Sequence, residues 1–330
     1  MFLEPKNKGW QPSASIENLK ARAELLAEIR AFFHKRGVLE VETPLLCSTT
    51  SLHPHIKPIE ACYTNPQYPE KKKYYLQTSP EFEMKRLLSA GSGPIYQLNK
   101  AFRDDESGRL HNPEFTMLEW YRPDFDQHAL MDEIDDLLGL VLNVPKAERL
   151  TYGFLFARSF NINPYQTSVE ELEQCAREYQ INISEEVRRT LTINDWLDIL
   201  MTHCIESKLG LERPVILYDY PATKAALAKI RSTEPWVAER FEVFVDGIEL
   251  ANGYHELTDP EVQLMRFQED CELRRELGLP EIAIPYDLIE ALKVGLPASS
   301  GVALGFDRLL MLKLKCQHIE EVMAFTIDRV

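Results

Sequence analysis

Length, composition and charge narrow the classes of protein to which this chain can belong. It has 330 residues, of which 45% are hydrophobic, so it can bury a large core as one big domain or as a core with an insertion. Its formal net charge of −15 is a disadvantage for binding nucleic acid, because most of that affinity comes from Lys and Arg side chains.

The sequence gives no sign of a membrane or secretory segment. No apolar run approaches the roughly 20 residues that cross a bilayer, and the first fifteen residues lack an apolar signal core. The six cysteines are scattered without a CxxC pair, which indicates reduced thiols more than disulfides or a zinc site. We therefore expect a soluble cytoplasmic protein with no membrane partner.

The N-terminal part is predicted to be a helix followed by irregular structure. Over residues 15–36 apolar side chains recur at spacings of three and four, with Ser15 as a cap and Gly37 as a left-handed residue after the helix. Residues 46–75 are expected to be loop and edge structure, because four prolines interrupt them. Within that range Lys71–Lys73 is better explained by a solvated loop than by a docking patch.

A hairpin with a charged loop is predicted at residues 102–121, which read FRDDESGRLHNPEFTMLEWY. Apolar runs flank the charged stretch, and Gly108 and Pro113 favour a loop between two strands over a helix. Two arginines and a histidine beside carboxylates suit a ligand that carries both phosphates and amines. A solvated hairpin tip with surface ion pairs would explain the same residues equally well.

The rest of the chain is predicted to contain both helices and strands. Residues 126–212 are expected to form a mainly helical insertion, in which Ser168–Glu171 is a capping box. Residues 214–221 and 240–250 are rich in strand formers, and residues 259–278 begin with a helix cap and a proline. These elements, with no βαβ rhythm, predict an α+β fold in which a central antiparallel β-sheet is flanked by helices.

Four segments resemble, in the right order, the signature motifs of the class II aminoacyl-tRNA synthetases in the form used by the lysyl enzymes. GVLEVETP at 37–44 resembles motif 1, residues 102–121 resemble motif 2, and GVALGFDRLLML at 301–312 resembles motif 3. RFEVFVDGIELANGYHEL at 240–257 resembles the strand pair that holds magnesium and lysine. The resemblance covers residues 15–330, and it implies a class II catalytic core that forms a homodimer through the motif 1 helix and strand.

The resemblance implies that ATP and Mg²⁺ activate a substrate carboxylate as an adenylate. Arg103 and Arg308 would be catalytic, with Arg103 bridging the carboxylate and the α-phosphate and Arg308 facing Phe115 across the adenine. Glu242 and Glu249 would hold the magnesium ion, although surface glutamates on strands would look the same. The residues implied to bind ATP are Arg103, Asp104, Asp105, His111, Asn112, Phe115, Glu249, Leu250, Gly305 and Arg308.

One departure affects the ATP site. The usual FRNE of motif 2 reads FRDD here, so that Asp105 stands where the family has glutamate. Either Asp105 or the neighbouring Glu106 would then contact ATP or the substrate amine, and the sequence leaves both assignments open.

The resemblance also implies that the substrate is lysine or an isomer of lysine. Glu81, Tyr121 and Glu256 match residues that surround the distal ammonium group, and Asn252 matches a position near the carboxylate end. Ala303 replaces a motif 3 glycine, and its methyl group favours an amine on the β-carbon, although neutral drift explains the alanine equally well. The residues implied to bind the amino acid are Ser79, Pro80, Glu81, Tyr121, Asn252, Glu256 and Ala303.

Two features set the chain apart from enzymes that charge tRNA. Residues 1–14 form only a short extension before the catalytic domain, so we expect no anticodon-binding domain, and the chain is acidic. With Ala303, this resembles the elongation factor P–lysine ligases, which attach (R)-β-lysine to the ε-amine of one lysine on elongation factor P. tRNA is then an unexpected partner. The alternatives are a minimal lysyl-tRNA synthetase, an asparagine synthetase of the same fold, and a non-catalytic lysine sensor.

Overall fold

The computed structural model describes residues 9–65, 68–104 and 106–330. The chain divides into two compact units, which we describe separately. The first unit comprises Met1–Tyr121, Asp259–Leu296 and Leu304–Val330, and the second comprises Arg122–Thr258 and Pro297–Ala303. No helix in the described residues is both long and apolar enough to cross a membrane.

Helix α1 (Ile16–Lys35) of the first unit confirms the prediction for the N-terminal part. The Ser15 side chain caps its first turn, and Gly37 follows its end with a φ of 66°, a backbone conformation that glycine adopts without strain. One face of the helix is buried, and it carries Leu25, Ile29, Phe32 and Phe33.

The predicted hairpin is formed by two strands of the first unit, β5 (Ile95–Phe102) and β6 (Glu114–Pro123), and the short strand β1 (Leu39–Glu40) lies beside β5. Strand β1 pairs in parallel with β5, which pairs antiparallel with β6. The last pair of the hairpin, Phe102 and Glu114, lies directly before the charged loop. The prediction of two strands joined by this loop is therefore confirmed.

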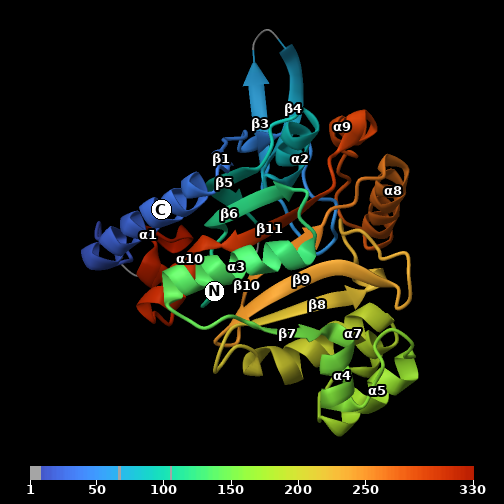
Figure 1. Ribbon diagram of the computed structural model, residues 1–330. Coiled ribbons are helices and arrows are strands. Elements are labelled where there is room, and N and C mark those ends of the chain that lie inside the picture. Colours follow the sequence, from blue (N-terminus) through green and yellow to red (C-terminus); the bar gives the residue numbers. More distant parts are fainter. Residues whose placement is uncertain (1–8, 66–67, 105) are drawn as a thin grey trace. The chain divides into compact units, whose positions relative to one another are not determined.

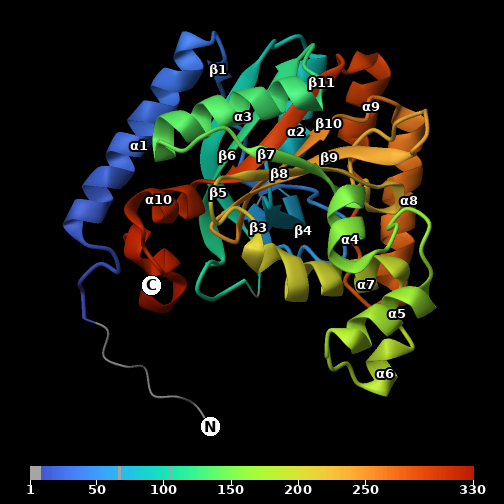
Figure 2. The same ribbon diagram turned by 60° about the horizontal axis from the view of Figure 1, so that its bottom comes forward.

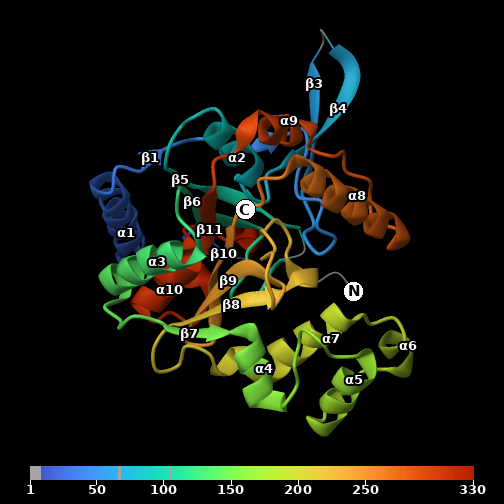
Figure 3. The same cartoon turned by 45° about the vertical axis from the view of Figure 1, so that its right-hand side comes forward.

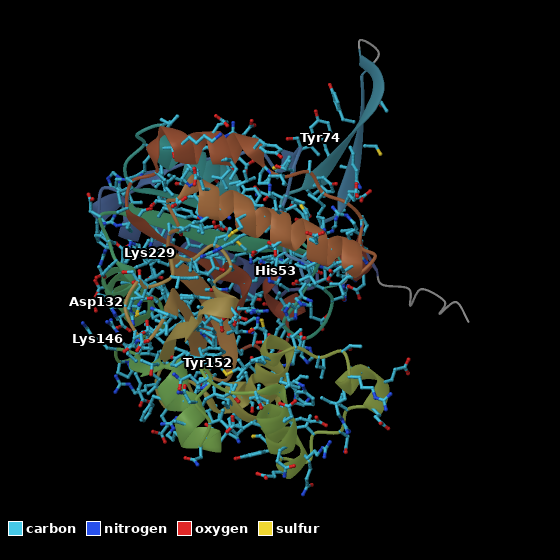
Figure 4. The ribbon with its side chains drawn as sticks, turned by 90° about the vertical axis from the view of Figure 1, so that its right-hand side faces the viewer. His53, Tyr74, Asp132, Lys146, Tyr152 and Lys229 are labelled. Carbon is cyan, nitrogen blue, oxygen red and sulfur yellow. The ribbon has the colours of Figure 1, made fainter. Side chains whose placement is uncertain are left out.

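A small second sheet replaces much of the loop structure that was expected over residues 46–75. It contains β2 (Leu46–Cys47), β4 (Tyr68–Leu76) and β3 (Glu60–Asn65), in that order and antiparallel. The β3–β4 hairpin extends away from the rest of its unit (Figure 1), and Tyr74 lies on it (Figure 4). Lys71–Lys73 belongs to β4, so the loop prediction was wrong there, because a run of lysines does not show the apolar alternation that indicates a strand.

Among the other helices of the first unit, α8 (Pro260–Glu276) follows its predicted start. Helix α8 begins at Pro260, where the Asp259 carboxylate accepts hydrogen bonds from two backbone N–H groups. In α10, Asp307 lies 2.6 Å from Arg22 of α1, which ties the first and last helices of the unit together (Figure 2). The helices are α2 (Glu81–Ser89), α8 (Pro260–Glu276), α9 (Tyr286–Gly295) and α10 (Phe306–Leu314).

The second unit contains a sheet and a group of helices. Its strands lie in the order β11 (Ser299–Gly305), β10 (Ile248–His255), β9 (Val237–Val245), β8 (Val215–Pro221) and β7 (Glu148–Thr151). The neighbours β10, β9 and β8 are antiparallel, whereas β7 runs parallel to β8. Antiparallel strands with flanking helices in both units confirm the predicted α+β class.

Most residues of the segment predicted as a helical insertion are helical. They form α3 (Gln127–Leu142), α4 (Tyr152–Phe160), α5 (Val169–Glu178), α6 (Glu185–Arg188) and α7 (Ile193–Leu200). Figure 3 shows α4 to α7 gathered in one group. Their shared core includes Tyr152, Leu172 and Trp196, each less than 2% exposed, together with Phe244 of the sheet.

The predicted capping box at Ser168 is only half formed. The Ser168 hydroxyl accepts from the backbone N–H of Glu171 (3.3 Å), but the Glu171 carboxylate accepts from the Thr167 hydroxyl (2.7 Å) instead. A complete box occurs at Thr192, whose side chain and backbone exchange hydrogen bonds with Asp195. The box at Thr192 was missed because its N3 residue is aspartate instead of the usual glutamate or glutamine.

Candidate functional site

The predicted site residues occur in both units, and those of the first unit begin at the end of strand β5. The Arg103 backbone N–H donates to the Pro113 carbonyl (2.9 Å), which holds both ends of the charged loop together. The Arg103 guanidinium lies 5.2 Å from the centre of the Phe115 ring and 3.7 Å from the Glu106 carboxylate. Its Nε is a buried donor that has no acceptor among the described residues. A phosphate or carboxylate oxygen would satisfy that donor.

The side chain of Arg308 contacts that of His111, which belongs to this loop. Arg308 lies in the first turn of α10, and its Nη2 lies 2.6 Å from His111 Nε2. Burial and the neighbouring cations Arg308 and Arg103 lower the pKa of His111, while Glu106 opposes them. A neutral imidazole can accept the arginine hydrogen, so the geometry and the lowered pKa are consistent with each other. Two arginines thus flank one neutral histidine, an arrangement suited to an anionic ligand.

The remaining loop residues differ in the hydrogen bonds and ion pairs that they make within the fold. Asn112 is buried and its side-chain amide is used in the fold, because it donates to the Glu114 carbonyl and accepts from the Ile327 backbone N–H. Asp104 lies 3.3 Å from Lys57 in an exposed pair. The third predicted residue of this group, Asp105, lies outside the described residues.

The buried carboxylate of Glu119 links residues of the predicted amino-acid site in the first unit. The sequence analysis did not single it out. Glu119 is 2% exposed, and its two oxygens accept from the Ser79 hydroxyl (2.8 Å) and the Tyr121 hydroxyl (2.7 Å). Ser79 also accepts from the Glu81 backbone N–H (3.1 Å), at the start of α2. The signal was available, because Glu119 stands two residues before Tyr121 on one strand and therefore shares its face. We call Ser79, Glu81, Glu119 and Tyr121 the carboxylate cluster.

The second unit places its predicted metal ligands on the antiparallel strands β9 and β10. Glu242 stands opposite Asn252 across the strand pair. Its Oε1 accepts from Arg240 (2.5 Å) and its Oε2 accepts from the Tyr220 hydroxyl (2.6 Å). Glu249 lies nearby, exposed at the start of a β-bulge. Burial disfavours the charge of Arg240, but Glu242, two tyrosines and Glu249 together raise its pKa above the usual value.

The chemistry of this pair of glutamates is compatible with magnesium. Magnesium commonly takes one or two protein carboxylates, with phosphate oxygens and water as its other ligands. Glu242 and Glu249 both interact with Arg240, which indicates that the two carboxylates lie on one side of the strand pair. Within the described part of the chain, no group of three or more His, Cys, Asp or Glu residues could hold a metal ion by itself.

The other predicted residues of the second unit lie on β10, directly after its end, and on β11. Glu256 is 1% exposed, and its backbone N–H donates to the Ser299 carbonyl (2.9 Å). Asn252 accepts from Arg240 through its side-chain oxygen (3.3 Å). Leu250 is buried in the bulge of β10, and Ala303 is partly buried in β11, which ends at Gly305.

Comparisons with known proteins show the family of the chain. The family model described as tRNA synthetases class II (D, K and N) matches residues 10–329. A protein named elongation factor P–(R)-beta-lysine ligase from Vibrio vulnificus is 51% identical over 96% of this chain and 97% of its own length. A protein of the same name from Photobacterium profundum is 50% identical over 97% of this chain and 98% of its own length.

Proposed function

Because the chain belongs to the class II tRNA synthetases of the D, K and N group, we propose that it is an ATP-dependent ligase acting on elongation factor P. It activates (R)-β-lysine as an adenylate and transfers it to the ε-amine of one lysine of that protein. The carboxylate cluster carries the proposal, because two carboxylates with hydroxyl donors suit the ammonium groups of a diamino acid. The six free cysteines agree with a reducing compartment, and we place the activity in the cytoplasm.

The first half of the reaction forms the adenylate. An oxygen of the β-lysine carboxylate attacks the α-phosphorus of ATP, the bond to the β-phosphate breaks, and diphosphate leaves. Arg103 holds the carboxylate and the α-phosphate in line, and its buried Nε supplies a donor that the described residues leave unused. Neutral His111 contacts the other phosphates, and Arg308 faces Phe115 across the adenine. Glu242 and Glu249 would hold a magnesium ion that offsets the phosphate charges.

The second half transfers the activated acyl group. The neutral ε-amine of the acceptor lysine attacks the carbonyl carbon of the adenylate, AMP leaves with the bonding electrons, and the amine releases a proton. The product is an amide, in contrast to the ester that a tRNA hydroxyl would form. The enzyme thus needs a protein surface as its partner and no anticodon reader.

Amino-acid specificity comes from paired polar groups. In this proposal Glu81, Tyr121 and Glu256 surround the distal ammonium, with Glu119 fixing the Tyr121 hydroxyl. A substrate without that ammonium would leave buried carboxylates unpaired, which costs far more than the loss of a methylene contact. Asn252 contacts the carboxylate end, and Ala303 lines the space beside the α-carbon.

A competition experiment tests the proposal. Elongation factor P and bulk tRNA are offered together to the enzyme with ATP, magnesium and labelled (R)-β-lysine, and the label is then located. We expect the label on the protein, as a mass gain of one lysyl unit. Label on tRNA would establish a minimal synthetase, whereas label on neither, together with failed adenylate formation, would favour a lysine sensor.

A further inference from the structure

Lys85 of helix α2 is a buried cation within the predicted amino-acid site. Its side chain is 2% exposed. Lysine is among the residues least often buried, and removing an ammonium group from water costs several kcal/mol unless a partner offsets it. An ammonium at this place is also unexpected chemically, because the site is proposed to receive the ammonium of a substrate.

The partner of Lys85 is the Glu81 carboxylate. Lys85 Nζ lies 2.6 Å from Glu81 Oε1, one helical turn away on the same face of α2. The Glu81 backbone N–H is itself held by the Ser79 hydroxyl. Glu81, Ser79 and Gln77 also line a small cavity of about 30 Å³ in the first unit. The Glu81 carboxylate is therefore fixed at one oxygen, while its side chain also borders this cavity.

The charges of this region nearly balance. Glu81 and Glu119 bring two carboxylates, Lys85 brings one ammonium, and Ser79 and Tyr121 bring neutral hydroxyl donors. Within the first unit the carboxylates of this cluster therefore outnumber the ammonium groups, which favours a cationic ligand. Without Lys85 the Glu81 carboxylate would lose this cation, and its orientation would no longer be fixed.

We propose that Lys85 is a positioning residue for the amino-acid substrate, which it orders by holding one oxygen of Glu81 so that the other receives the substrate ammonium. This inference rests on the proposed function, because it takes the ligand to be a diamino acid. Lys85 itself does not touch the substrate in this arrangement. Its effect is expected on amino-acid binding and not on ATP.

Pyrophosphate exchange with (R)-β-lysine tests the role of Lys85. For Lys85→Met we expect the KM for the amino acid to rise about tenfold or more, from the loss of a charged hydrogen bond, with kcat and the KM for ATP within about twofold. Lys85→Arg keeps the charge and should recover part of the loss. The matched control is Arg86→Met, which removes the next cation of the helix, 46% exposed and 3.7 Å from Asp287, and should change neither KM.

A double variant separates positioning from a contribution to folding alone. In the Glu81→Gln background, Lys85→Met should add little further change in the amino-acid KM, because the two residues act as a pair. This variant also avoids an unpaired buried carboxylate, so it serves if Lys85→Met alone folds poorly. Additive effects on the KM, an unchanged KM in Lys85→Met, or an equal rise in the KM for ATP would each overturn the inference. Absence of exchange by the wild-type enzyme with either lysine isomer would instead overturn the proposed function.

Discussion

Ala303 bears most directly on which lysine isomer is activated, because its methyl group stands where the lysyl enzymes have glycine. Ala303→Gly should relax the discrimination against α-lysine by about tenfold or more, since one methylene-sized contact is worth about 1–3 kcal/mol. Pyrophosphate exchange with the two isomers measures the ratio. Ala298→Gly, at an exposed alanine close by, controls for the backbone freedom that any new glycine adds. An unchanged isomer preference would mean that the methyl group does not select the substrate.

The contact between His111 and Arg308 should make stability depend on pH. Burial, Arg308 and Arg103 lower the pKa of His111 from its usual 6.5, so near that pH the folded chain binds fewer protons than the unfolded chain. The contact therefore stabilises the protein above about pH 6.5 and is lost as the pH falls through the lowered pKa. Neighbouring atoms enclose the His111 ring only in part and its side chain remains exposed to water, so solvent screening should keep the contribution below about 1 kcal/mol.

Urea unfolding from pH 8 to pH 5 measures this contribution. The difference in unfolding free energy between the wild type and His111→Gln should change over the acidic part of that range, because glutamine can accept from Arg308 at every pH. Parallel curves for the two proteins would contradict the prediction.

At the scale of elements, two neighbouring tyrosines join strands β8 and β9 to the helical insertion. The two differ in whether the hydroxyl group makes a hydrogen bond. Tyr220 donates to Glu242 (2.6 Å), whereas the buried hydroxyl of Tyr152 has no partner among the described residues, and the two rings lie 4.8 Å apart. Tyr220→Phe should therefore lower the free energy of unfolding by about 1.5–3 kcal/mol, the worth of a hydrogen bond to a charged group. Tyr152→Phe should be nearly neutral. Equal losses in chemical denaturation would show that packing, not hydrogen bonding, decides both.

Local sequence patterns predicted the helices whose ends carry a capping residue, a glycine or a proline. Helix α1 was predicted from Ser15, Gly37 and its apolar period, and α8 from its cap and proline. The small sheet was not predicted, because β4 carries a proline and three lysines that conceal its alternation. A strand with few buried side chains lacks the alternation of apolar and polar residues from which strands are predicted.

The site was predictable only where a motif named the residue. Arg103, His111 and Arg308 were expected together, and the structure brings them together in the first unit. Glu119 was missed although it shares a strand face with Tyr121. Lys85 was missed because a buried charge is recognised by its partner, and the burial of Lys85 is known only once α2 is packed. The sequence alone therefore suggests the groups that are expected to face a ligand more readily than the groups that hold them in place.

For the whole molecule, exposed leucines after helix α1 bear on the expected homodimer. Leu39 of β1 is 55% exposed, and Leu45 and Leu46 are 40% and 41% exposed. Exposed apolar side chains that gather in one stretch are typical of protein interfaces. They lie in and just after the motif 1 strand, through which the family resemblance implies that two chains associate, so we expect them to be covered by a second copy.

Leu39→Asp tests this association. A two-fold axis repeats each interface residue, so the change removes two buried leucines, each worth about 1.5–3 kcal/mol, and the dimer should weaken by more than about 100-fold. Sedimentation equilibrium should give about twice the 38.1 kDa chain mass for the wild type and one chain mass for the variant at micromolar concentration. Val294→Asp in α9, at a side chain that is 81% exposed, is the matched control and should stay dimeric. A wild-type monomer, or dissociation by both variants alike, would contradict an interface built on β1.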